Sequence, residues 1–313
     1  MATIIDPNAK MTQARATSLG LEQDLGNGYV VAVRGTYKQF LNLQYAVNIN
    51  LAQYVDGSTT VLSPSAYNDG YASKWNQFSN VATNRPYRAT VRGRSLDLTG
   101  FGDVILSKYD GEGRYRSLVL EASKTPNNGG WGFKGNLTFS KAEDNNSNER
   151  ATLTSATALT ENPADPLGSY SLSDNDHKFR AVLAWYAPTM YGVRVSGITT
   201  FTTGRPFNAV YYNDQNGDGK YIDSVNGRNT FRQPASKTFD LRLARTFKPS
   251  SKLSLEGIID VFNFFNWANQ YTSQVNYATT KGSAPDSYTA SFGQIDKPDN
   301  RTREVQFTLK ARF

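Results

Sequence analysis

The sequence has no cysteine, one histidine and no long apolar run among its 313 residues. The absence of cysteine excludes disulfides, thiolate metal sites and cysteine nucleophiles. The longest apolar stretches fall well short of about 18 residues, so transmembrane helices are excluded too. Residues 1–6 have neither a basic region nor an apolar core, so the sequence does not open with a signal peptide.

Positive charge is in modest excess, with a formal net charge of +7. Proteins that bind nucleic acid usually cluster such charge into a basic patch. Here the lysines and arginines are spread over alternate positions of strand-like segments and through polar stretches. This distribution predicts charges that line a wet interior or face solvent, and no nucleic-acid partner.

The prominent pattern is an alternation of apolar and polar residues with a period of two. In the last segment, 303–313, the apolar positions are Val305, Phe307, Leu309, Ala311 and Phe313. Strand side chains alternate between faces, so this segment has one apolar face and one polar face. Its length of about ten residues suits a tilted strand that crosses a bilayer.

The same alternation recurs and gives about nine candidate strands. They are expected at 17–25, 29–38, 115–124, 131–140, 178–187, 191–201, 239–244, 253–261 and 303–313. Tight turns are expected at 27–28, 188–190 and 248–251. Long polar loops are expected at 39–112, 143–176, 203–235 and 266–301, and the segment 101–109 is interpreted as a hairpin inside the first of them. Short turns at one end and long loops at the other are typical of outer-membrane barrels.

These patterns predict an all-β fold, an antiparallel transmembrane β-barrel segment of about 9–10 strands that is part of a larger barrel with long extracellular loops. The hydrophobic fraction of 38% fits, because only alternate residues of a barrel strand need be apolar. The 18 tyrosines and 17 phenylalanines would supply aromatic girdles. Two alternatives stay open: a self-contained small barrel, such as a porin or adhesin, and a soluble all-β module that binds carbohydrate or protein.

Strand parity predicts which side chains face lipid and which face the interior. The predicted lipid-facing residues are Leu183, Trp185, Val193, Val195, Leu253, Leu255, Val305, Phe307 and Leu309. The predicted interior residues are Lys134, Arg194, Arg242, Glu256, Glu304, Lys310 and Arg312. Turns near 27, 189 and 250 are expected on the periplasmic side, and loops near 60, 155, 218 and 285 outside the cell.

Catalytic motifs are scarce. His177 follows Asp176, a pair that acid–base chemistry can use, but no nucleophile motif accompanies it, and a polar residue at a strand start is the simpler interpretation. The Gly-Glu-Gly-Arg run at 111–114 is interpreted as a turn rather than a phosphate loop. The sequence therefore predicts no enzymatic function.

One segment resembles the opening of a calcium loop. Asp214, Asn216 and Asp218 supply oxygen ligands at positions 1, 3 and 5, and a glycine follows at position 6. Position 12 is Val225 instead of the usual glutamate, and Asp223 at position 10 is the available substitute. The alternative is an Asx turn in an exposed loop, in which case no cofactor is bound.

Several motifs of the C-terminal half occur in a fixed order. They are Thr-Gly-Arg-Pro-Phe at 203–207, the Asp-rich stretch 214–219, 227–234, 239–247, Asp-Val-Phe-Asn-Phe-Phe-Asn at 260–266 and the terminal Phe313. In this order they resemble the closing part of TonB-dependent outer-membrane receptors, most closely the Oar-like branch. The resemblance covers 170–313 well and 11–142 more loosely. It implies that Phe313 is the C-terminal aromatic residue that the outer-membrane assembly machinery reads.

The resemblance implies a barrel of about 22 strands. An N-terminal plug fills such a barrel, which imports a carbohydrate, siderophore or peptide with energy from the inner-membrane TonB complex. The sequence contains no plug-like domain and no segment that would contact TonB. We therefore expect residues 1–313 to be the C-terminal portion of such a barrel in the outer membrane of a Gram-negative-type bacterium. The expected partners are outer-membrane lipid, the missing plug and barrel half, the TonB complex through that plug, and the assembly machinery.

Overall fold

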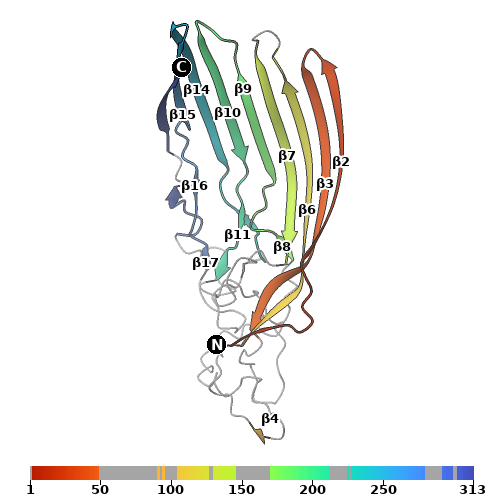
Figure 1. The fold of residues 1–313 in the computed structure, drawn as a ribbon. Coiled ribbons are helices and arrows are strands. Elements are labelled where there is room, and N and C mark those ends of the chain that lie inside the picture. The colour runs from red at the N-terminus through yellow and green to blue at the C-terminus, as the bar shows by residue number, and fades with distance from the viewer. Residues whose placement is uncertain are drawn as a thin grey trace.

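The computed structural model describes residues 2–48, 90–91, 94–95, 104–126, 130–145, 170–211, 224–225, 227–278, 291–298 and 302–313. Its main sheet follows the order β19-β15-β14-β10-β9-β7-β6-β3-β2, so each of these nine strands lies beside its sequence neighbour (Figure 1). The strands are β2 (Gln13–Gly26), β3 (Tyr29–Asn48), β6 (Val104–Lys124), β7 (Gly132–Asp144), β9 (Phe179–Tyr186), β10 (Val193–Thr202), β14 (Ser236–Ser250), β15 (Leu253–Phe262) and β19 (Glu304–Arg312). The all-β, antiparallel prediction is confirmed, and each of the predicted strands is present.

Shorter strands lie near the ends of this sheet. Beside it, β1 (Ala2–Ile5) pairs in parallel with β6, and β8 (Ser171–Leu172) pairs with β7. Four separate two-stranded pairs are β4 (Thr90–Val91) with β5 (Arg94–Ser95), β11 (Pro206–Phe207) with β13 (Phe231–Arg232), β12 (Val210–Tyr211) with β17 (Asn276–Ala278), and β16 (Gln270–Tyr271) with β18 (Lys297–Pro298). In the described part of the chain, no helix is long and apolar enough to cross a membrane.

The short turns all lie at one end of the sheet. The turn residues 27–28 join β2 to β3, 191–192 precede β10, and 251–252 join β14 to β15. Asn27 and Tyr191 have φ angles of 52° and 53°, which non-glycine residues adopt mainly in tight turns. The C-terminus lies at this same end (Figure 1). The predicted loop centres near 60, 155, 218 and 285 lie outside the described residues.

The expected hairpin at 101–109 and the turn at 111–114 are wrong. Residues 104–124 form one continuous strand, β6, which pairs with β3 as far as Asn48, so the first long connection is 49–103 rather than 39–112. The two glycines that suggested a turn serve close strand packing instead. A Cβ on Gly111 would lie 2.9 Å from the carbonyl oxygen of Leu43, and one on Gly113 would lie 3.2 Å from that of Glu143.

One face of the sheet is apolar across all nine strands. The register places Val305 opposite Val261, and Phe307 opposite Ile259. Further along the sheet it aligns the predicted lipid-facing residues of β9, β10 and β15 with the same face. Val305 and Phe307 are 52% and 74% exposed, so no second sheet covers them. A β-sheet with an uncovered apolar face of this extent suits contact with lipid.

Aromatic side chains mark both limits of the apolar face. Towards the long loops, Phe139, Phe179 and Phe201 form a row across three neighbouring strands, with ring centroids 5.1 and 5.9 Å apart. Towards the short turns, Trp131 lies 6.4 Å from Tyr29 and 5.8 Å from Phe133. Trp131 and Phe139 are separated by about 26 Å along the strand. This separation is of the same order as the apolar band of about 25 Å in outer-membrane barrels.

The opposite face carries the charges. The register confirms that all seven predicted interior residues share this face. Arg242 makes a two-pronged ion pair with Asp260, with N–O distances of 2.6 and 3.0 Å. Arg194 pairs with Glu256, which lies opposite Lys310. Cross-strand pairs of opposite charge stabilise this polar face.

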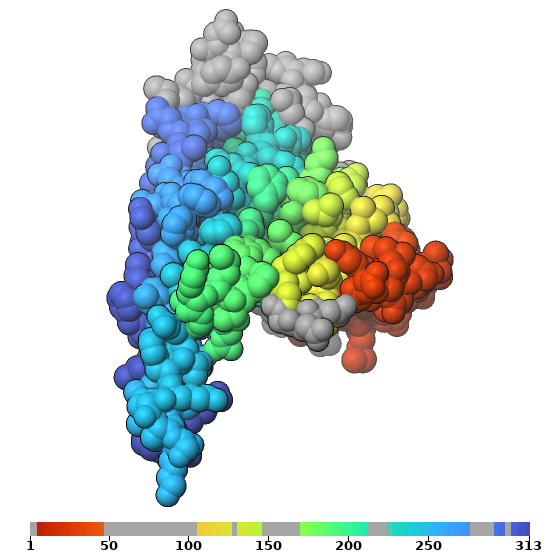
Figure 2. Space-filling view, turned by 90° about the horizontal axis from the view of Figure 1, so that it is seen from above, coloured from red at the N-terminus to blue at the C-terminus, as the bar shows by residue number. Residues whose placement is uncertain are grey.

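The sheet is an open wall rather than a closed ring. Seen from above, the red N-terminal part and the blue C-terminal part lie on opposite sides of the molecule and stay apart (Figure 2). Within the described residues, β2 and β19 each pair with one neighbour only. An open sheet with one lipid-facing side is the geometry of a segment of a barrel wall.

Candidate functional site: a polar pocket at the long-loop end

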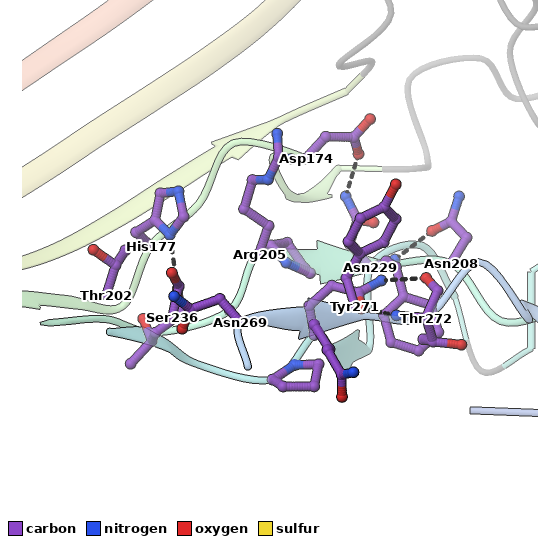
Figure 3. Close-up of a pocket in the computed structure, with 17 residues that line it drawn as sticks. Asp174, His177, Thr202, Arg205, Asn208, Asn229, Ser236, Asn269, Tyr271 and Thr272 are labelled. Atoms are coloured by element: carbon purple, nitrogen blue, oxygen red, sulfur yellow. Dashed lines mark hydrogen bonds between the residues drawn. The ribbon is translucent and has the colours of Figure 1, made fainter. Parts of the chain in front are cut away.

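A pocket of about 700 Å³ lies at the long-loop end of the sheet (Figure 3). Four segments line it, within 174–177, 202–208, 229–236 and 269–272. Thr202 and Ser236, which face each other at the ends of β10 and β14, belong to the polar face of the sheet. The pocket therefore continues the polar face, beyond the level where the apolar band ends.

A segment that we call the strap, 227–236, forms one side of this pocket. Arg228 near its start is buried, and its guanidinium donates to Asp144 Oδ1 at the end of β7 over 2.6 Å. The next residue, Asn229, has a φ of 59° and donates from Nδ2 to Asp174 Oδ1 over 2.7 Å. The backbone N–H of Asn229 donates to Asn208 Oδ1 over 2.6 Å. These contacts fix the strap against three separate segments.

A second arginine holds the other half of the strap. Arg232 pairs with Asp176, whose side chain is 1% exposed and also accepts a hydrogen bond from the Ala142 N–H over 2.7 Å. Arg232 Nη1 donates to the Gly204 carbonyl over 3.1 Å. At Gly204 a Cβ would lie 1.8 Å from the Gln233 carbonyl oxygen, so only glycine allows the strap to pass this close.

Two side-chain amides complete the floor of the pocket by imitating backbone pairs. Gln233 donates to the Thr272 carbonyl over 3.0 Å and accepts from the Thr272 N–H over 2.8 Å. Asn269 makes the same two bonds with Lys237, both at 2.8 Å. Because these amides are used internally, they position the floor and are not the groups that a ligand would engage first.

Other polar groups of the pocket are available to a ligand. In the part of the chain that the structure describes, the side chains of Arg205 and Gln270 make no hydrogen bond, and the Tyr271 hydroxyl makes none either. Tyr271 is 43% exposed. The Asp174 carboxylate is half-exposed but already accepts a hydrogen bond from Asn229 and lies 3.8 Å from the Arg228 guanidinium. The pocket thus offers one cation, an amide and a phenol, which suits a polar ligand.

His177 has a structural contact at the edge of the pocket. Its Nδ1 hydrogen-bonds the Thr203 carbonyl over 2.8 Å, so Nδ1 carries the proton in this contact. Asp176 is engaged with Arg232 and Ala142 instead. Asp176 and His177 therefore do not form an acid–base pair.

The predicted calcium ligands Asp214, Asn216 and Asp218 lie outside the described residues, so the calcium site stays a prediction. Val225, at position 12 of that loop, is described. Its side chain is 3% exposed and its N–H donates to the Ala209 carbonyl over 2.7 Å. Among the residues that the structure describes, no three histidine or acidic side chains gather closely enough to hold a metal ion.

The C-terminal aromatic lies far from the pocket. Phe313 follows β19 at the short-turn end and is fully exposed. The motif 260–266 covers the end of β15 and the turn after it, where Asn263 and Asn266 have φ angles of 47° and 52°. Asn263 Oδ1 accepts from the Trp267 N–H over 3.0 Å, and the Asn263 N–H donates to Asp240 Oδ1 over 2.8 Å. This motif therefore anchors the loop that carries Asn269 and Tyr271.

Sequence reasoning did not find the pocket. The strap residues belong to the motif 227–234, on which the family resemblance partly rests. However, no local sequence pattern predicts that Arg228 and Arg232 contact Asp144 and Asp176. One usable signal was the pair of isolated asparagines, 229 and 263, because asparagine is enriched at positive φ.

Comparison with known proteins decides the family. The family model of the outer membrane beta barrel domain matches residues 1–226. The chain belongs to this family. It is accordingly an outer-membrane protein, which fits the uncovered apolar face of its sheet. A comparison with curated proteins finds no match.

Solved structures give the fold context. The outer membrane transporter YddB from Escherichia coli matches with a TM-score of 0.52 and 11% identity, over 99% of this chain and 34% of that one. The FrpB iron transporter from Neisseria meningitidis matches with a TM-score of 0.47 and 13% identity, over 99% of this chain and 32% of that one. BauA, the ferric preacinetobactin receptor from Acinetobacter baumannii, matches with a TM-score of 0.46 and 13% identity, over 96% of this chain and 29% of that one. The chain thus spans about a third of the length of these proteins, and the likeness to YddB supports the barrel fold.

Proposed function

We propose that this β-barrel domain forms part of the wall and the mouth of a TonB-dependent transporter, of the Oar-like branch, for a carbohydrate, siderophore or peptide. The observation that carries the proposal is the position of the pocket. It opens on the polar face of β10 and β14, which would face the lumen of a closed barrel, and it lies at the long-loop end. A pocket there can hold a ligand before the ligand enters the lumen.

The two faces of the sheet supply the other requirements of such a wall. The apolar face contacts hydrocarbon, and ion pairs such as Arg242–Asp260 keep the polar face hydrated and fixed in shape. The chain itself performs no catalysis in this proposal. Energy coupling would depend on a plug and its contact with TonB, both of which this proposal places outside residues 1–313.

The open edges favour a larger barrel. Residues 1–313 would be its C-terminal portion, and further strands would pair with β2 and β19, because unpaired backbone groups at a sheet edge are costly inside a bilayer. The long-loop end would be extracellular and the short turns periplasmic. Phe313 would then stand at the periplasmic rim, where the assembly machinery can bind it.

A transport assay tests the proposal. Cells that produce the protein in its native outer membrane would be offered labelled ferric siderophores, oligosaccharides and peptides, with and without a protonophore. We expect uptake of one class that a protonophore abolishes and that the double substitution R205A/Y271A reduces at least tenfold. The control K248Q/K252Q, at the short-turn end, should leave uptake unchanged. Uptake or ion conduction that ignores the protonophore would instead favour a passive small barrel.

A further inference from the structure

A cluster of cations lies on the lipid-facing side of the sheet, just beyond the apolar band. The register aligns Arg116 of β6 with Lys141 of β7, two residues past the aromatic Phe139 towards the long loops. The next aligned row contains Arg15 and Arg114. We call Arg15, Arg114, Arg116 and Lys141 the basic patch. The strand parity places it on the same uncovered apolar face as Leu118 and Phe139.

Within this patch, like charges stand next to each other. Arg116 and Lys141 are direct cross-strand partners, an arrangement that is destabilising without a counter-charge. One carboxylate, Glu143, bridges both, with N–O distances of 2.6 Å to each. The two cationic side chains remain 55% and 53% exposed, whereas that of Glu143 is 16% exposed. The single carboxylate therefore lies beneath the two cations and leaves their outer sides open.

The row that contains Arg15 and Arg114 adds to the excess of positive charge. Arg114 lies with its guanidinium 5.6 Å from the ring centroid of Tyr170 and 3.7 Å from Glu112. Arg15 is exposed on β2. Among the described residues of these two rows and their ion-pair partners, four cations thus face two carboxylates, Glu112 and Glu143. These charged side chains are not needed to hold β6 and β7 together, because the backbone pairing of the two strands is continuous through this region.

The depth of the basic patch along the strands determines which part of the membrane it contacts. The aromatic row through Phe139, Phe179 and Phe201 marks the interface between hydrocarbon and headgroups. Side chains one and two rows beyond it, on the lipid-facing side, lie at headgroup depth. Cations at this depth attract anionic headgroups.

We propose that the basic patch binds the phosphate groups of lipid headgroups, and specifically those of the phosphorylated glycolipid of the outer leaflet. The assignment to that leaflet rests on the proposed orientation, with the long loops outside the cell. Arginine fits this role because its planar guanidinium can bind a phosphate with two parallel hydrogen bonds. Glu143 forms ion pairs with both Arg116 and Lys141, so its carboxylate competes with a phosphate for these two side chains.

The test is lipid content measured by native mass spectrometry. Protein purified in mild detergent from the outer membrane of its own bacterium would be mixed with lipid A or with dephosphorylated lipid A. We expect wild type to retain lipid A and not its dephosphorylated form. R116Q/K141Q should reduce binding about tenfold or more, and E143Q should increase it, because the competing carboxylate is lost. K248Q/K252Q removes the same charge at the short-turn end and should bind as wild type does.

Opposite effects of R116Q/K141Q and E143Q separate recognition from mere folding damage, which would lower binding in both variants. The inference is overturned if R116Q/K141Q binds as much lipid A as wild type, or if dephosphorylated lipid A binds equally well. Failure of the transporter proposal is a different result. It would show as uptake that ignores the protonophore, whereas micelle binding of lipid A would be unaffected.

Discussion

The guanidinium of Arg228 donates a hydrogen bond to Asp144 Oδ1 over 2.6 Å, although the two residues lie 84 positions apart in the sequence. Both side chains are nearly buried. This contact ties the strap of the pocket to the end of β7. It is therefore the clearest link between the wall of the barrel and the mouth.

Replacement of Arg228 by methionine should loosen the strap. It leaves Asp144 as a buried charge without this partner, and loss of one member of a buried pair costs about 3–5 kcal/mol. We expect faster hydrogen exchange in 170–176 and 227–236, with the sheet unaffected. R205M, which removes an exposed arginine of the same pocket, is the matched control. The double variant R228M/D144L should be less destabilised than R228M, and equal exchange in all variants would contradict the role.

The lipid contact of the apolar face can be tested on neighbouring residues of β7. Leu137 lies on the apolar face and Asn136 on the polar face, both near the middle of the strand. L137R should cost about 2–4 kcal/mol and lower the amount of heat-modifiable protein in the outer membrane. N136R should be nearly neutral, because its side chain remains in water. Equal losses in the two variants would show that the face assignment is wrong.

The Asp296 loop should be acid-sensitive. Asp296 accepts hydrogen bonds from the Ser273 hydroxyl and N–H over 2.5 and 2.7 Å, and these lower the pKa of its carboxyl from 3.8 to about 2. Because the pKa is lowered in the folded loop, the ionised carboxylate stabilises the loop at pH values above the ordinary pKa of 3.8. This stabilisation is lost as the pH falls towards about 2. Pepsin should therefore cleave 291–298 increasingly below pH 4, relative to D296N. Parallel cleavage curves for the two proteins would contradict this.

Calcium binding can be measured directly by calorimetry. Because position 12 of the loop is the buried Val225, the bidentate ligand is missing. We expect any calcium affinity to be weak, with a dissociation constant of about 10⁻⁴–10⁻³ M, and to disappear in D218A. A tight stoichiometric site would show that other oxygens complete the coordination.

The edge strands predict the behaviour of the isolated chain. The outer edges of β2 and β19 expose backbone groups that pair readily with other chains. Expressed by itself, the chain should form inclusion bodies, and co-expression with further barrel strands should rescue folding. Refolding in detergent to a protease-resistant, ion-conducting monomer would contradict the larger barrel and favour the small one.

The sequence by itself determined the order of the strands, their faces and the approximate positions of the short turns, although the turns expected at 188–190 and 248–251 lie at 191–192 and 251–252. These features are local: a period of two assigns each side chain to a face, and turn residues such as Asn27 mark where a strand ends. The same locality explains the error at 101–114. Two glycines in a polar stretch usually signal a turn, and only the presence of Leu43 and Glu143 across the ladder shows that they lie in a strand.

Only the tertiary structure decided the pocket, the strap and the basic patch. Arg228 meets Asp144, and Arg116 aligns with Lys141, because the strand register brings together residues that no local pattern connects. The local charge balance depends on these pairings. An arginine beside an aspartate is neutralised, whereas an arginine beside a lysine leaves an excess of positive charge that attracts an anion. Composition fixed how many charges the chain carries. Register decided that Arg116 and Lys141 share the single carboxylate of Glu143.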